Sequence, residues 1–433
     1  MKKILSILAL VLIAAMGTTF AQGWTPMGNF PNDLFTGNTG GHGVAVDPDG
    51  KVWCMFYGAT DSVVDVNSGL TKVCRAVYVF NADGTPTAFS PIKTVTVGGV
   101  TDTLYNSNRG LKADNNGNIL VSSFDVLYRI NYQTGEGMAR VQPVVGMTLT
   151  AAAVDGMGNV FTAPVIPGNP IGMYTSDFTF LGNAVDASVG FSRTLEVSAD
   201  GNTIYWTGYT NNLIYIYTRA SEFDPFALTD STLFGFACES ATWSRDGNFL
   251  WLSSGSGLTP PNAYPGVTTS YDVSTWYAWN PSTNTIVDSL KWQFNTPGSP
   301  DERPRGLAFS PNGNIAYATC FGGSSYPAFQ KFERPTSVDE EGQTVVNGYA
   351  LSQNYPNPFN PTTKISFELP MSGYTTLKVY DMLGNEVATL VQNELASGSH
   401  SVNFNAANFA SGTYVYQLNV NGTRITNKMV LLK

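Results

Sequence analysis

The chain has 433 residues, and its 32 acidic side chains outnumber 23 basic ones, giving a formal net charge of −9. Nucleic acid binding needs a basic surface, so this balance argues against nucleic acid as a partner. Charged residues make up only 13% of the chain and aromatic residues 12%, with 43 glycines and 24 prolines, which is typical of a turn-rich β protein. At about 150 residues per domain, the length predicts two or three domains.

The N-terminus has the pattern of a secretory signal peptide. Two lysines precede an apolar run over residues 4–15, and the small residues Thr19 and Ala21 stand at positions −3 and −1 before Gln22. This run is too short for the roughly 20 apolar residues that span a bilayer. We therefore expect a signal peptide over residues 1–21 and no transmembrane segment.

A repeated unit organises the next 300 residues or so, for example RGLKADNNGNILVSS and RGLAFSPNGNIAYAT. The side chains six and four residues before the anchoring glycine of each unit are apolar, and the residue three before it is Asp or Ser. Period-two alternation that runs into such a turn predicts a β-hairpin, because Asp or Ser bonds back to the turn and glycine supplies a positive φ. The anchoring residues are Gly50, Gly117, Gly158, Gly201, Gly247 and Gly313.

The repeat predicts a six-bladed β-propeller over residues 22–335. Two further strand-like runs follow most hairpins, and a four-stranded unit of about 40–45 residues is typical of a propeller blade. The last unit lacks a fourth strand, which we expect Trp24–Phe30 to supply. A seven-bladed ring is the alternative, if a long gap hides a degenerate blade. In their GLAxxxDGxxY pattern the units resemble NHL-type and gluconolactonase-type repeats.

Polar residues recur eight positions before each anchoring glycine, where the innermost strand of a blade should enter the central channel. Three arginines, a histidine and a glutamate at one channel mouth form a candidate site for a carboxylate or sulfate. The favoured alternative is that these side chains brace neighbouring blades. Two long connections, 58–71 and 255–270, are candidates to wall the same face. The six positions are His42, Arg109, Thr150, Arg193, Glu239 and Arg305.

Metal and cofactor signals are weak. The chain has only two histidines, His42 and His400, so a multi-histidine metal site is excluded. The gluconolactonase resemblance implies a Glu/Asn/Asp metal set in the channel, but the corresponding positions here are mainly arginine. We therefore expect no metal, no cofactor and no assigned catalytic residue.

Four cysteines in an exported chain permit disulfides. Cys54 and Cys74 fall on strands that the sequence places side by side, so a bond between them is possible. Cys238 and Cys320 have no evident mate.

The C-terminal part differs from the repeats. A polar stretch over residues 336–350 is expected to be a linker, and residues 351–433 show short alternating runs punctuated by glycine, which is typical of a small β-sandwich. Through QNYPNPFNPTT, VYDMLGNEVATL, SGTYVYQL and KMVLLK, this part resembles the type A C-terminal sorting domain of proteins exported by type IX secretion, an immunoglobulin-like sandwich. The resemblance implies that the type IX machinery recognises residues 351–433, and it locates the protein in the medium or at the outer-membrane surface of a Gram-negative bacterium.

The sequence thus predicts an all-β protein, a six-bladed β-propeller followed by a C-terminal immunoglobulin-like β-sandwich. We expect a secreted or cell-surface binding or scaffold protein that meets an unknown glycan, peptide or surface ligand. The alternative is an extracellular carbohydrate-active lyase or hydrolase, in which Glu239 with Arg193 and His42 does acid–base work at the channel mouth. The lack of a nucleophile or metal motif favours binding over catalysis.

Overall fold

The computed structural model describes residues 23–31, 40–254, 271–292 without 273, 303–321, 328–334 and most of 350–432. Within these ranges the chain forms strands and turns and contains no helix. The expected signal peptide, the connection 255–270 and the expected linker lie outside the described residues, apart from residue 350.

The described residues of the first part of the chain form six sheets of three or four antiparallel strands. Five are built from one consecutive stretch each, and the sixth also includes the N-terminal strand. The first sheet contains β2 (Gly41–Val46), β3 (Val52–Phe56) and β6 (Val77–Phe80). The second contains β9 (Asn108–Ala113), β10 (Ile119–Ser123), β11 (Val126–Ile130) and β12 (Gly137–Val141). The third contains β13 (Ala153–Val154), β14 (Val160–Thr162), β15 (Ile171–Tyr174) and β16 (Phe180–Val185). The fourth sheet contains β17 (Leu195–Val197), β18 (Thr203–Gly208), β19 (Leu213–Thr218) and β20 (Ala227–Thr232). The fifth contains β21 (Ala241–Trp243), β22 (Leu250–Ser254), β23 (Thr275–Asn280) and β24 (Thr285–Lys291). The sixth contains β25 (Arg303–Phe309), β26 (Ile315–Phe321), β27 (Phe329–Glu333) and β1 (Thr25–Asn29).

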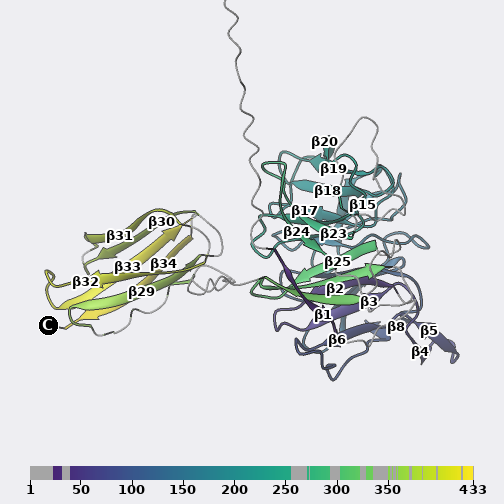
Figure 1. Ribbon diagram of the computed structural model, residues 1–433, viewed down its shortest axis with the longest axis horizontal. Coiled ribbons are helices and arrows are strands. Elements are labelled where there is room, and N and C mark those ends of the chain that lie inside the picture. The colour runs from purple at the N-terminus through teal and green to yellow at the C-terminus, as the bar shows by residue number, and fades with distance from the viewer. Residues whose placement is uncertain are drawn as a thin grey trace, which may run out of the picture.

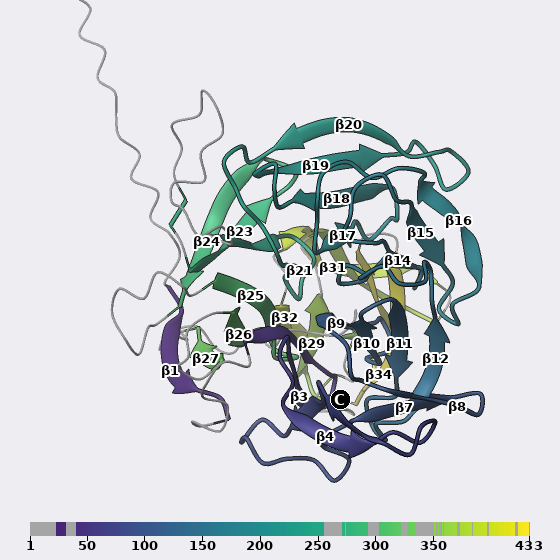
Figure 2. The same cartoon turned by 90° about the vertical axis from the view of Figure 1, so that its right-hand side faces the viewer.

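The six sheets stand around a common centre, with the first strand of each innermost (Figure 2). β2 contacts both β9 and β25, which joins the first sheet to the second and the sixth, and β17 contacts β13 and β21. Apolar side chains fill the space between sheets: Trp53 of the first packs with Leu111 and Val121 of the second. This is the predicted β-propeller. The blade count stays a prediction, because parts of this region lie outside the described residues.

The N-terminal segment pairs with the last sheet, as expected. β1 lies antiparallel to β27, with Thr25 opposite Glu333 and Asn29 opposite Gln330. The sixth sheet therefore joins strands from both ends of the repeat region. This pairing covers what would otherwise be an exposed strand edge.

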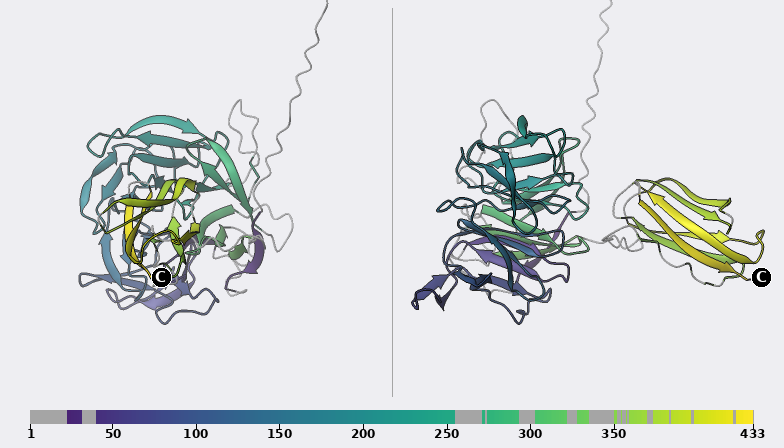
Figure 3. Two further views of the ribbon diagram at one scale, coloured as in Figure 1. Left: turned by 90° about the vertical axis from the view of Figure 1, so that its left-hand side faces the viewer. Right: turned by 180° about the vertical axis from the view of Figure 1, so that it is seen from behind.

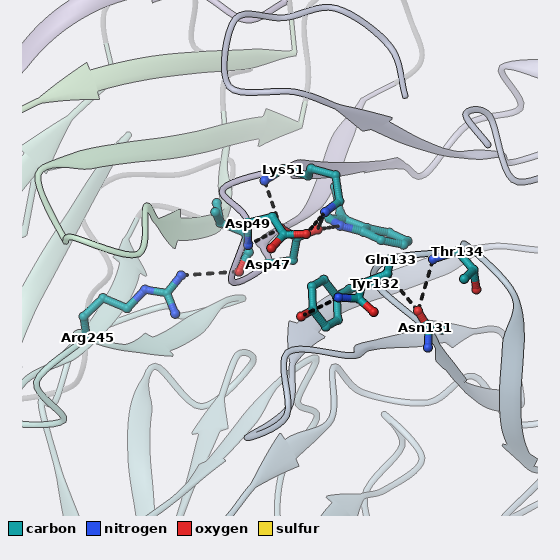
Figure 4. A network of polar contacts seen from close by, with 10 residues as sticks. Asp47, Asp49, Lys51, Asn131, Tyr132, Gln133, Thr134 and Arg245 are labelled. Carbon is teal, nitrogen blue, oxygen red and sulfur yellow. Dashed lines mark hydrogen bonds and ion pairs between the residues drawn. The ribbon is translucent and has the colours of Figure 1, made fainter. Parts of the chain in front are cut away.

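The hairpin turns have the predicted chemistry. In the first, the Asp47 carboxylate accepts hydrogen bonds from the backbone N–H of Asp49 (3.0 Å) and Lys51 (2.9 Å) and from Nε1 of Trp53 (2.9 Å; Figure 4). In the sixth, the Ser310 hydroxyl accepts from the N–H of Ile315 at 2.9 Å. The six anchoring glycines all have φ between 71° and 88°, a conformation that is strained for other residues.

The first sheet departs from the four-stranded unit that the repeat predicts, because its described residues form a sheet of three strands. Instead β7 (Thr94–Val97) turns back at Gly98–Gly99 and pairs with β8 (Val100–Thr103); only an isolated bridge links Val77 to Ile92. Both glycines have positive φ, at 58° and 81°, so they allow the tight turn that diverts the strand. A second inserted hairpin follows β3, formed by β4 (Asp61–Val64) and β5 (Thr71–Cys74). It extends outward from the ring (Figure 3).

The possible disulfide between Cys54 and Cys74 is absent. All four cysteines are buried and none is bonded to another. The reason is the inserted hairpin: Cys74 ends β5, whose partner is β4, whereas Cys54 in β3 lies opposite Tyr78 of β6.

Residues 350–432 form a second body, drawn apart from the ring in Figure 1. One sheet contains β28 (Ala350–Leu351), β29 (Thr362–Leu369) and β32 (Gly398–Asn405), and the other contains β31 (Glu386–Leu395), β30 (Gly373–Tyr380), β33 (Gly412–Val420) and β34 (Thr423–Leu431). Both sheets contribute to one core, with Ile365 and Phe367 from the first and Leu377, Tyr416 and Leu418 from the second. This is a β-sandwich-like arrangement; its immunoglobulin-like topology stays a prediction.

The proline-rich entry to the sandwich is tied to its last two strands. The backbone N–H of Asn354 donates to the Tyr416 hydroxyl at 2.9 Å. Phe359 is buried, its N–H donates to the Val430 carbonyl at 2.9 Å, and its carbonyl accepts from the N–H of Leu432 at 3.0 Å. The motif at the start and the strand at the end therefore form one folded unit.

Candidate functional site

The structure brings the five predicted site residues to one end of the central channel. His42, Arg109 and Arg305 lie in the innermost strands β2, β9 and β25. Arg193 and Glu239 lie just before β17 and β21. All five stand where an innermost strand begins, so we call them the mouth cluster. The sixth position, Thr150, is buried before β13.

Glu239 joins two arginines from neighbouring sheets. Its Oε2 lies 2.6 Å from Nε of Arg305, and its Oε1 pairs with Nη1 of Arg193. Glu239 and Arg305 are only 2% and 1% exposed. Burial lowers the pKa of Arg305 to about 10, against the charge of Glu239, which raises it, so this arginine still carries its proton at neutral pH. These three residues brace the fourth, fifth and sixth sheets.

Arg109 stands apart from this triad. Within the part of the chain that the structure describes, its guanidinium pairs with no acidic side chain; it lies over the ring of Tyr57, 5.2 Å from the centroid. Its Nε is buried without a hydrogen bond. Burial lowers the pKa of Arg109, and the charge of Arg193 lowers it further. The mouth cluster contains three arginines and one glutamate, and Glu239 is already paired with two of the arginines. The cluster therefore has an excess of positive charge.

His42 is buried beside these charges. Its Nδ1 donates to the backbone carbonyl of Arg109 at 2.9 Å, which fixes the ring. Burial is the main cause that holds the pKa of His42 well below its usual 6.5, and the charges of Arg305, Arg109 and Arg193 add to it. The imidazole is therefore neutral at neutral pH.

Replacing His42 with glutamine is expected to reduce the loss of stability on acidification. Below pH 6.5 His42 is protonated in the unfolded chain but stays neutral in the folded chain, so acid favours the unfolded state. The free energy of unfolding is therefore unaffected by this group above pH 6.5 and falls as the pH drops from 6.5 toward the lowered pKa of the folded state. One such group changes the free energy of unfolding by at most about 1.4 kcal/mol per pH unit. Urea unfolding between pH 7.5 and 5.5 measures the slope. His400→Gln is the control, and an unchanged slope in His42→Gln would contradict the assignment.

Aromatic side chains surround the mouth cluster, and the sequence reasoning missed most of them. Arg193 lies over Tyr209 and Phe191, with centroids at 4.7 and 5.7 Å, and Arg305 lies over Phe321 at 5.2 Å. With Tyr57, all four rings are partly exposed. A usable signal exists: Tyr57, Tyr209 and Phe321 stand at or just after the end of the second strand of their sheets, and this end lies beside the mouth.

Two further contacts narrow the channel. Lys112 of β9 reaches Glu196 of β17 on a sheet that is not its neighbour in the ring. Burial raises the pKa of Glu196, whereas the charge of Lys112 lowers it. At the opposite end Arg245 donates to the carbonyl of Phe309 at 2.6 Å. It also donates at 3.3 Å to the carbonyl of Val46, next to Asp47 (Figure 4), and so links the fifth sheet to the sixth and the first.

The space left inside is small. A cavity of about 30 Å³ is lined by His42, Arg109, Lys112, Glu239 and Arg305, among others. This volume holds about one or two water molecules. A sugar ring does not fit in this volume, so the space available to a larger molecule at this face is outside the cavity, beside the aromatic side chains.

The described residues offer no metal centre and no membrane span. Their histidine, cysteine, aspartate and glutamate side chains form no group of three that could hold a metal ion. No helix among them has the length and apolar character needed to cross a bilayer.

Comparison with known protein families identifies the C-terminal part. Residues 353–432 match the family described as the secretion system C-terminal sorting domain. This confirms the resemblance that the tail motifs indicated: the chain carries a type IX sorting domain and is an exported protein of the cell surface or the medium. A comparison with curated proteins finds no match.

Several solved structures are similar in fold. PorZ, described as an essential surface component of the type IX secretion system of Porphyromonas gingivalis, is 14% identical with a TM-score of 0.38; the match covers 90% of this chain but only 51% of PorZ. Regucalcin from Agrobacterium tumefaciens, described as a calcium-binding protein, is 13% identical with a TM-score of 0.46, covering 72% of this chain and 95% of that one. A luciferin-regenerating enzyme is 12% identical with a TM-score of 0.46, covering 71% and 94%. At this level the similarities carry no argument about activity.

Proposed function

We propose that this exported protein is a binding protein whose propeller holds an extracellular ligand over the channel mouth, and that the sorting domain serves its delivery. The observation that carries the proposal is the composition of the mouth. Three arginines stand beside one carboxylate that pairs with only two of them, and partly exposed aromatic rings surround them. Arginine and tyrosine are the residues that most often dominate binding interfaces.

The state of Glu239 supports binding over catalysis. A lyase or hydrolase that used Glu239 as a general base would need one of its oxygens free to receive a proton. Here Oε1 and Oε2 each face an arginine. His42, the other candidate, donates its Nδ1 proton to a backbone carbonyl, which leaves Nε2 as the basic nitrogen. Burial and the charges of the three arginines hold the pKa of His42 well below 6.5, so this nitrogen is a weak base. The geometry therefore favours binding over proton abstraction by this pair.

Glycan and peptide arrays probed with the chain from Gln22 to Lys433 test the proposal. The Tyr209→Ala variant truncates a ring at the mouth, so the affinity for an identified ligand is expected to fall about tenfold, the effect of losing roughly 1.4 kcal/mol at an aromatic contact. Met157→Ala is the matched control, because Met157 is exposed in the turn between β13 and β14 at the opposite end of the channel. A ligand whose binding depends on Met157 and not on Tyr209 would place the contact elsewhere. The lack of any ligand on either array would also count against the proposal.

A further inference from the structure

Arg109 differs from the other two arginines of the mouth cluster in having no fixed anion beside it. We infer that the ligand presents an oxyanion, a carboxylate, sulfate or phosphate, to the guanidinium of Arg109 in the small channel cavity. This inference rests on the proposed binding function and assigns its ligand a chemical class. In this inference Arg109 contacts the ligand directly. The other three residues form a positioning unit that braces the sheets around it: Arg193, Glu239 and Arg305.

The charges that line the cavity do not balance. Glu239 has its two oxygens against Arg193 and Arg305, so neither oxygen remains for a third cation. The other carboxylate that lines the cavity, Glu196, is paired with Lys112. Among the described residues that line the cavity, Arg109 is therefore the cation left without an acidic partner. A partly buried guanidinium loses hydration that an anion in the cavity would replace.

The surroundings of Arg109 restrict its side chain before a ligand binds. Its guanidinium lies over the ring of Tyr57. The Tyr57 carbonyl accepts from Nε of Arg75 at 2.6 Å, and the Arg75 carbonyl accepts from Nδ2 of the buried Asn108 at 2.9 Å. These bonds hold the backbone of Tyr57, and its ring packs against Phe321 with centroids 5.4 Å apart, so the surface under the arginine is fixed. A side chain fixed before binding loses less conformational entropy when the ligand arrives.

The size of the cavity limits which chemical group can enter it. The cavity of about 30 Å³ has room for about one or two water molecules, which is the scale of an oxyanion head and excludes a sugar or a peptide side chain with its backbone. Lys112 with Glu196 crosses the channel, and Arg245 bridges its far end. An oxyanion attached to a larger molecule therefore enters from the mouth only, with the rest of the molecule outside.

The arginine charges also make the potential in the cavity positive. Burial first, and then the charges of Arg305, Arg109 and Arg193, keep the pKa of His42 low. Burial disfavours any ion, but the arginine charges that disfavour a proton on His42 favour a negative charge in the same cavity.

Binding of simple oxyanions to the full exported chain, residues 22–433, tests the inference. Sulfate, phosphate and acetate are compared with chloride at equal ionic strength. An oxyanion that binds is expected to raise the melting temperature by about 2 °C at ten times its dissociation constant. The Arg109→Gln variant should lose this shift, with affinity reduced at least tenfold. Arg424→Gln removes the same charge from an exposed site in β34 and should keep it.

A second measurement tests whether Arg109 contacts the ligand or instead braces neighbouring sheets. In chloride, Arg109→Gln should melt no lower than the wild type, because it removes a partly buried charge that has no acidic partner among the described residues; a brace would lower the melting temperature. Inorganic sulfate and a sulfated oligosaccharide are then compared as competitors for an array ligand. Tighter binding of the oligosaccharide indicates a group on a larger ligand, and equal binding indicates the free ion.

The outcomes also separate this inference from the proposed function. Suppose that an uncharged array ligand binds more weakly to Tyr209→Ala but with unchanged affinity to Arg109→Gln. This result would overturn the oxyanion assignment and would still support the proposed binding function. Oxyanion binding at Arg109 without any array ligand would overturn the binding of a larger partner. If none of the three oxyanions shifts the wild type, the inference is wrong.

Discussion

Replacing Glu239 with glutamine is expected to lower the free energy of unfolding by about 3–5 kcal/mol. The carboxylate is 2% exposed and stands between Arg193 and Arg305. Without its charge, two guanidinium groups remain close together, one of them fully buried, and nothing in the triad offsets the cost of their dehydration. The loss is a large part of the total, because folded proteins are stable by only about 5–15 kcal/mol. Urea unfolding of residues 22–433 at pH 7 measures it.

The matched control for this substitution is Glu333→Gln. Glu333 is an exposed residue of β27, where the same chemical change should stay within about 0.5 kcal/mol. A loss below about 1 kcal/mol in Glu239→Gln would show that the triad does not brace the sheets. Oxyanion binding gives an independent readout: the glutamine variant gains positive charge at the mouth and should bind sulfate at least as tightly as the wild type.

The hairpins could be predicted from the sequence because their determinants are local. Asp47 or Ser310 caps a turn formed within a few residues, and Gly50 or Gly313 supplies a positive φ that other residues avoid. The same regularity placed the mouth cluster. Each innermost strand runs about the same number of residues from turn to mouth, so counting back from the glycine selects residues that lie together at one end of the channel.

The partners within the site could not be predicted in the same way. Glu239 pairs with Arg193 and Arg305, residues that lie on other sheets, and the choice depends on how the ring closes. Long guanidinium side chains reach several acceptors from one backbone position, so spacing alone does not select one. The first sheet was mispredicted for a different reason: Gly98–Gly99 offered a tight turn that competed with pairing to β6.

The tail motif shows how a sequence signature becomes a structural requirement. Read as a string, QNYPNPFNPTT indicates an extended entry, since its prolines forbid a helix. In the structure, Phe359 of this motif forms an isolated parallel bridge with Leu431 near the end of the last strand. The two most distinctive parts of the sorting domain, its start and its end, thus depend on each other for folding.

We therefore expect Phe359→Ala to reduce export strongly. Phe359 is buried in the sandwich core, where its ring lies 6.1 Å from that of Phe404. Removing such a ring costs about 3–5 kcal/mol. A domain of roughly 80 residues is stable by only about 4–12 kcal/mol, so much of its stability is lost. The fraction of protein at the cell surface and in the medium of the native host measures the effect, with deletion of residues 347–433 as the reference for complete loss.

Tyr374→Ala is the matched control for the export experiment, because Tyr374 is 53% exposed on β30 of the same sandwich and its truncation should leave folding intact. Limited proteolysis of the purified chain reports whether the sandwich has opened in each variant. Normal export of Phe359→Ala with a protease-sensitive tail would show that the secretion machinery reads the sequence and not the folded domain. Loss of export in Tyr374→Ala with a protease-resistant tail would instead place the recognition surface on β30. We expect export to fall in Phe359→Ala only, and the tail of this variant to become sensitive to protease. This is the result if the secretion machinery requires the first motif and the last strand to be folded together.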